Sequence, residues 1–98
     1  MDNNIQVSYI NLAGIGLTVN AKQKHKKRKI YSLRITAILP DETVNIDLKI
    51  AIIDIKKNEK CGYSYRAVYR NLSDTQLSVL KKIAENFTKS EIISVEMS

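Results

Sequence analysis

The chain has 98 residues, of which 44% are hydrophobic, and it carries a formal net charge of +6. This length allows one domain with a single modest core. The sequence shows no run of about 18 apolar residues and no signal-like start, so we expect no membrane span and no secretion signal, and we expect a cytoplasmic protein. Cys61 is the only cysteine, which excludes an internal disulfide and a cysteine-based metal site. We interpret it as an inert loop thiol.

Alternating apolar residues predict strands in the first half of the chain. Residues 5–10 and 15–19 each have period two, and the turn between them, residues 11–14, contains asparagine and glycine. A third strand is predicted over residues 30–39, and the turn that follows it begins at Pro40. A fourth strand starts at Val44. Its alternation slips by one residue at Ile52, which predicts a bulge or bend there.

A fifth strand is predicted over residues 63–70, with tyrosines on one face and arginines on the other. We expect the tyrosines to face the core rather than to form an exposed stacking platform. Ser73 and Gln76 form a capping-box pattern, which predicts a helix over about 74–88. The apolar stripe of that helix consists of Leu77, Leu80, Ile83, Ala84 and Phe87.

These elements predict a single domain, 1–98, that is mainly β: an antiparallel β barrel or strongly bent sheet with a C-terminal α-helix. Sequential antiparallel pairing is the simplest topology for short connections. Residues 91–98 are compatible with an edge strand, with an extension that packs on a partner, or with a tail.

Positive charge is concentrated in one segment between the second and third predicted strands. One interpretation is a solvated loop that blocks edge pairing. The other is a patch that binds phosphates or an anionic surface. The basic residues of this segment are Lys22, Lys24, Lys26, Lys27, Arg28 and Lys29.

The pattern favours binding over catalysis. His25 lies within the basic segment and the carboxylates are scattered, so we expect no catalytic residues, no metal site and no cofactor. The segment Asn11 to Gly16 is either an ordinary hairpin turn or a place where its glycines let backbone amides approach an anion. Arg66 and Arg70 project on the same side of a strand. They are either surface residues that only keep the chain soluble or a pair whose guanidinium groups suit phosphate or stacked bases.

Residues 9–17, Tyr-Ile-Asn-Leu-Ala-Gly-Ile-Gly-Leu, resemble the segment of PilZ domains that carries the D/N-x-S-x-x-G motif. Residues 67–73, Ala-Val-Tyr-Arg-Asn-Leu-Ser, are similar to the closing strand of that family and its exit into the final helix. The resemblance covers nearly the whole chain. It implies a six-stranded antiparallel barrel with a C-terminal helix and a role in bacterial signalling through cyclic di-GMP. The residues it implies for a degenerate nucleotide site are Tyr9, Asn11 and Gly14, to which we add Arg66.

The chain departs from the family motif. Tyr9 stands where the motif has Asp or Asn, Asn11 stands where it has Ser, and Gly14 is kept. A frame shifted by two residues keeps Asn11 and Gly16 but places Ala13 at the serine position. The upstream R-x-x-x-R motif of nucleotide-binding members has no counterpart before Tyr9. We therefore expect weak or no cyclic di-GMP binding by the chain itself.

The predicted function is a non-catalytic adaptor with a protein partner in a cyclic di-GMP-linked pathway, such as motility, pilus assembly or exopolysaccharide export. One alternative is a cyclic di-GMP receptor whose arginines come from a preceding segment or another subunit. A second alternative is a small basic β-barrel that binds nucleic acid through the basic segment and Arg66. Self-association into a homo-oligomer through the apolar residues of the tail is also open.

Overall fold

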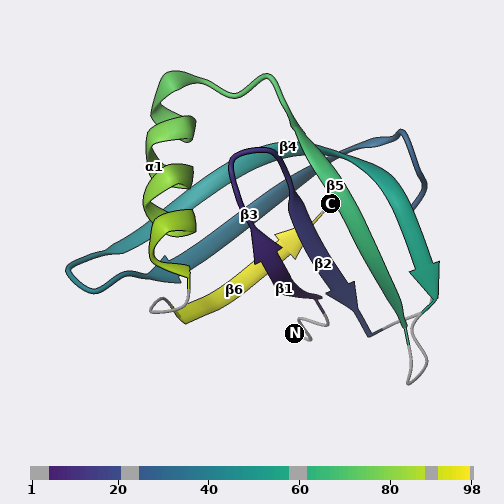
Figure 1. Ribbon diagram of the computed structural model, residues 1–98, viewed down its shortest axis with the longest axis horizontal. Coiled ribbons are helices and arrows are strands. Elements are labelled where there is room, and N and C mark those ends of the chain that lie inside the picture. Colours follow the sequence, from purple (N-terminus) through teal and green to yellow (C-terminus); the bar gives the residue numbers. More distant parts are fainter. Residues whose placement is uncertain (1–4, 21–24, 58–61, 88–90, 98) are drawn as a thin grey trace.

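The computed structural model describes residues 5–20, 25–57, 62–87 and 91–97, with the backbone alone for residues 91–94. Within these ranges the chain forms six β-strands and one α-helix (Figure 1). In chain order they are β1 (Ile5–Ile10), β2 (Ile15–Val19), β3 (Ile30–Ile38), β4 (Thr43–Lys57), β5 (Tyr63–Arg70), α1 (Asp74–Glu85) and β6 (Glu91–Met97). Cys61, Lys22 and Lys24 lie outside the described residues.

The strands form one antiparallel sheet in the order β1-β2-β5-β4-β3-β6, which confirms the predicted fold class. The sheet curls into a half-barrel, and the two edge strands β1 and β6 approach each other (Figure 1). The prediction of sequential pairing is wrong at one place, because β2 pairs with β5 and not with β3. The connection from β2 to β3 is the longest that joins two strands without a helix, so it does not force these two to be neighbours.

The residues after the helix form β6, which pairs antiparallel with β3. Of the alternatives for this segment, the structure therefore shows the edge strand. The predicted bulge in β4 is confirmed, since its register against β5 shifts between Ile52 and Asp54. Figure 1 shows β4 bending around the sheet, which is the effect expected of a bulge in a curled sheet.

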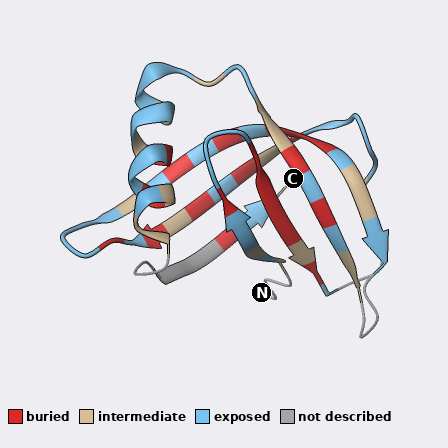
Figure 2. Ribbon diagram, in the orientation of Figure 1, coloured by how far each residue is buried: buried red, intermediate tan, exposed pale blue. Residues whose placement is uncertain are grey.

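The core lies on the concave face of the sheet. Buried positions alternate with more exposed ones along β3 and β5 and the first part of β4, as expected for strands with one face on the core (Figure 2). In β2 both faces are largely buried. The predicted inward direction of the tyrosines is confirmed, because Tyr65 is 2% exposed and both Tyr63 and Tyr69 pack against the core. The largest fully buried side chains are Ile15, Leu17, Leu33, Ile35, Leu48, Ile50, Ile52, Leu80 and Ile83.

Helix α1 begins with the predicted capping box. The Ser73 hydroxyl accepts a hydrogen bond from the Gln76 amide at 3.1 Å, and the Ser73 amide donates to Gln76 Oε1 at 2.8 Å. Leu80 and Ile83 are buried against the sheet, but Leu77 is 41% exposed. The predicted apolar stripe is therefore wrong at Leu77. The helix also ends at Glu85 rather than at residue 88.

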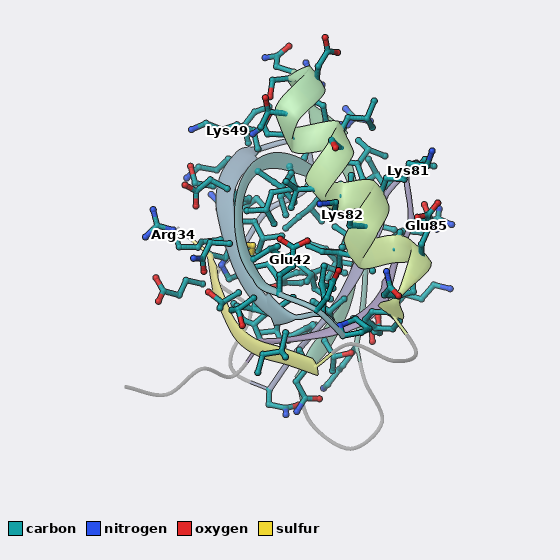
Figure 3. The ribbon with its side chains drawn as sticks, turned by 90° about the vertical axis from the view of Figure 1, so that its left-hand side faces the viewer. Arg34, Glu42, Lys49, Lys81, Lys82 and Glu85 are labelled. Atoms are coloured by element: carbon teal, nitrogen blue, oxygen red, sulfur yellow. The ribbon has the colours of Figure 1, made fainter. Side chains whose placement is uncertain are left out.

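Two polar contacts fix α1 against the strands. Gln76 Nε2 donates to the Asp47 carbonyl oxygen at 2.6 Å, which ties the first turn of the helix to β4. Lys82 Nζ lies 3.1 Å from Glu42 Oε2, in the connection between β3 and β4. Figure 3, which looks along the curl of the sheet, shows α1 lying across its open side.

Candidate functional site

The turn between β1 and β2 is the centre of the predicted nucleotide site. Asn11 Oδ1 accepts hydrogen bonds from the amides of Ala13 at 2.8 Å and Gly14 at 2.9 Å. The Asn11 amide donates to the Gly14 carbonyl at 3.0 Å. The asparagine side chain thus acts as the acceptor for the turn, which is a common role for this residue. The amides of Asn11, Ala13 and Gly14, which an anion would need as donors, already have partners inside the turn.

Tyr69 on β5 holds this turn in place. Its hydroxyl lies 2.9 Å from the Asn11 carbonyl oxygen and 3.0 Å from the Gly14 carbonyl oxygen, and it donates to these two acceptors. Burial raises the pKa of Tyr69 far above its ordinary value, and the neighbouring Tyr9 raises it further. The hydroxyl is therefore protonated and able to donate throughout the physiological range.

Gly14 is required by a close approach between strands. A Cβ atom at this position would lie 2.6 Å from the Ala67 carbonyl oxygen on β5, well inside van der Waals contact. The absence of a side chain lets the turn pack directly on the backbone of β5. The one residue that keeps the family motif thus has a structural role in this chain.

Tyr9, Gly16 and Arg66 occupy one row across the outer face of β1, β2 and β5. Gly16 pairs with Tyr9 on one side and with Arg66 on the other. A Cβ atom on Gly16 would lie 2.2 Å from the Tyr9 ring, so the ring covers the glycine. Tyr9 is 38% exposed and Arg66 is exposed. The fold therefore brings Tyr9 and Arg66 to opposite sides of Gly16, next to the Asn11–Gly14 turn.

The basic segment is anchored at a different part of β5. His25 Nδ1 lies 2.9 Å from the Tyr65 hydroxyl, and its ring makes edge-to-face contacts with Tyr31 and Tyr65. The Lys26 amide donates to the Tyr31 hydroxyl at 2.8 Å. Burial raises the pKa of Tyr65, and Tyr31 and Tyr63 raise it further. The segment thus has a fixed attachment to the barrel from His25 onward.

The cations that follow His25 are all exposed. They are Lys26, Lys27, Arg28 and Lys29. Lys29 Nζ lies 5.6 Å from the centroid of the Tyr31 ring, in cation–π range. Arg28 has a positive φ of 68°, and its amide donates to the Ile52 carbonyl at 2.8 Å. This hydrogen bond places Arg28 beside the bulge in β4.

The sequence did not predict the hydrogen bonds that the tyrosine hydroxyls make. The alternation predicted that the tyrosines face inward. It did not predict that the Tyr69 hydroxyl bonds to the β1–β2 turn or that the Tyr65 hydroxyl bonds to His25. The available signal was chemical: a strand face lined only for packing has no need of hydroxyl groups, and buried tyrosines usually have a hydrogen-bond partner.

Among the described residues, no cluster of three or more histidines, cysteines, aspartates and glutamates could hold a metal ion. The closest charge pair on the sheet, Arg34 Nε and Asp47 Oδ1 at 2.7 Å, is exposed. The hydrogen bond from Arg34 lowers the pKa of Asp47. None of the described helices is long and apolar enough to cross a membrane.

The chain matches none of the family models, curated proteins or solved structures with which it was compared. The fold and the site together define a small curled antiparallel β domain with a C-terminal helix and an internally bonded glycine turn. The PilZ resemblance continues to depend on the motif residues themselves.

Proposed function

We propose that this chain is a non-catalytic PilZ-like adaptor that acts through protein contacts in a bacterial pathway linked to cyclic di-GMP. The pathway we propose controls motility, pilus assembly or exopolysaccharide export. The motif residues and the curled sheet with its terminal helix support the lineage. The hydrogen bonds that already engage the Asn11–Gly14 turn support an adaptor role rather than a nucleotide-receptor role.

The observation that carries this proposal is that the motif is engaged within the fold. Asn11 supplies its side-chain oxygen to the turn, and Tyr69 bonds to the turn carbonyls. The Tyr9 ring covers the backbone of Gly16. A nucleotide approaching this place would have to displace groups that stabilise the domain.

Of the four residues of the predicted nucleotide site, Tyr9, Asn11, Gly14 and Arg66, only Arg66 carries a cationic group, and it is exposed. A hydrogen bond to a charged group contributes about 1.5–3 kcal/mol. Micromolar affinity corresponds to about 8 kcal/mol. A single arginine therefore falls well short of tight nucleotide capture, which supports function through protein contact.

Isothermal titration with cyclic di-GMP tests the nucleotide half of the proposal. We expect a dissociation constant weaker than about 100 µM. Micromolar binding that is weakened by both Asn11→Ala and Arg66→Ala, with unchanged circular dichroism, would contradict it and favour a receptor. A stoichiometry of one nucleotide per two chains would then indicate that another subunit completes the site.

Genetic complementation tests the adaptor half. In the bacterium that encodes the chain, we expect deletion to alter motility or surface attachment. Because nucleotide contact is not required, the Asn11→Ala variant should restore the phenotype as fully as the wild type. Failure of this variant to complement, at wild-type protein levels, would contradict the adaptor role.

The exposed cations 26–29 support a second candidate, a nucleic-acid-binding protein. Phosphate contacts by these cations would give affinity for unrelated sequences, with a logarithmic salt slope of up to about −3 for single strands. Fluorescence anisotropy with a labelled DNA oligonucleotide measures this, with Lys27→Glu as the test variant and Lys81→Glu on α1 as the charge-matched control. Absence of binding at low salt would remove this candidate.

A further inference from the structure

The outer face of the sheet carries an apolar row across β3, β4 and β5. Ala51 pairs with Ile30 on one side and with Val68 on the other. Ile30 is 45% exposed, and Ile53, in the bulge beside this row, is exposed to the same extent. Ala51 is buried but is not part of the core cluster, which fits a position on the outer face. These four residues, Ile30, Ala51, Ile53 and Val68, form what we call the outer apolar row.

Cations lie on both sides of the outer apolar row. On one side Lys49 on β4 lies opposite Arg70 on β5 in the strand register, and both side chains are exposed. Figure 3 shows Lys49 directed away from the interior of the curl. On the other side lies Arg66, opposite Asp54, and Arg28 is held beside the bulge by its bond to Ile52. Positive charge thus exceeds negative charge along both borders.

The spacing of these rows fits a helix. Residues two apart on a strand are separated by roughly 6.6 Å, so the two cationic borders are roughly 13 Å apart. An α-helix with its side chains is about 10–12 Å wide. A helix lying on the outer apolar row would therefore bring the flanks of its apolar stripe next to Lys49 and Arg70 on one side and Arg66 on the other.

We infer that the outer face of β3, β4 and β5 is the docking surface for an acidic amphipathic helix of a protein partner. Carboxylates on both sides of an apolar stripe complement the cationic borders, and the stripe covers exposed isoleucine side chains. A second copy of this chain fits poorly, because each copy carries a net charge of +6. Nucleic acid fits poorly because stacking needs exposed aromatic rings, and the row is aliphatic. The inference rests on the proposed function only in that both make the chain a protein-binding domain.

The test uses a fluorescein-labelled synthetic peptide whose leucines at helical spacing are flanked by glutamates, with a scrambled peptide of equal composition as control. We expect saturable binding of the first peptide by fluorescence anisotropy. Amide shifts in nitrogen-15 spectra should concentrate at residues 30, 51, 66, 68 and 70. Binding of both peptides alike, shifts confined to residues 26–29, or no binding would each overturn the inference.

Two matched pairs of variants locate the contact. Ile30→Ser should weaken peptide binding by about tenfold, whereas Ile38→Ser, at an exposed position on the same face of β3, should not. Arg70→Glu should weaken it similarly, whereas Lys81→Glu on α1 should not. Equal effects within either pair would overturn the inference.

The same experiments distinguish two other occupants of this face, nucleic acid and a second copy of the chain. Displacement of the peptide by a DNA oligonucleotide with the same set of shifted amides would assign the face to nucleic acid. Shifts at the outer apolar row that grow with protein concentration alone would assign it to a second copy. Both outcomes would overturn the inference and leave the cyclic di-GMP titration unaffected, so the two proposals can fail separately.

Discussion

Replacing Tyr69 by phenylalanine tests whether its hydroxyl holds the β1–β2 turn. The change keeps the ring that packs against the core and removes the hydrogen bonds to Asn11 and Gly14. A net hydrogen bond contributes about 0.5–1.5 kcal/mol. Because Asn11 is exposed and its carbonyl can find water, we expect a loss of about 1 kcal/mol. This loss would lower Tm by roughly 4–8 °C.

The effect is measured by urea denaturation and by thermal unfolding followed by circular dichroism. Tyr9→Phe is the matched control, because it removes a hydroxyl from a tyrosine that is 38% exposed. We expect the control to change stability by less than about 0.5 kcal/mol. If Tyr69→Phe were as neutral as the control, the turn would not depend on this hydroxyl.

The pH dependence of stability gives an independent measure. The pKa of Tyr69 is raised in the folded chain above its ordinary value of 10.0, so the folded state holds this proton more tightly than the unfolded state. The resulting stability is complete below about pH 10 and is lost as pH rises from there towards the folded pKa. One such proton gives a slope of about 1.4 kcal/mol per pH unit. Tyr69→Phe should reduce the alkaline slope, and an unchanged slope would refute the assignment to Tyr69.

Substitutions at four further positions test the packing and the helix cap. Gly14→Ala should cost about 2 kcal/mol, because its Cβ would lie 2.6 Å from the Ala67 carbonyl oxygen; unchanged stability in urea would contradict this contact. Leu80→Ala should cost about 2–5 kcal/mol, because Leu80 is fully buried. Leu77→Ala on the exposed side should cost less than about 0.5 kcal/mol, and equal losses in thermal melts would refute this placement of the helix. Ser73→Ala should cost about 1 kcal/mol through loss of the N-cap, whereas Ser73→Asn should retain most of the stability.

Local patterns in the sequence predicted the local structure well. Alternation located the first five strands, the slip at Ile52 located the bulge, and the capping-box pattern of Ser73 and Gln76 located the start of the helix. Each of these features is determined by residues close together in the chain. The exposure of Leu77 was not predicted, because periodicity gives the direction of an apolar stripe but not how much of it the curled sheet covers.

Long-range features could not be predicted from these patterns. The pairing of β2 with β5 depends on the path of a long connection, which alternation does not record. The turn at Asn11 was predicted, but the bond that Tyr69 makes to it joins residues far apart in the chain. The proximity of Tyr9 and Arg66 likewise follows from the strand order. The outer apolar row became visible only when the registers of three strands were known.

The cover that Tyr9 provides over Gly16 has a consequence for how this domain can diverge. An aromatic ring above a glycine in the neighbouring strand is a large and small pair that fills one fixed volume. Any ancestor or descendant with a larger residue at position 16 must carry a smaller or displaced residue at position 9. Substitutions at these two positions should therefore occur together.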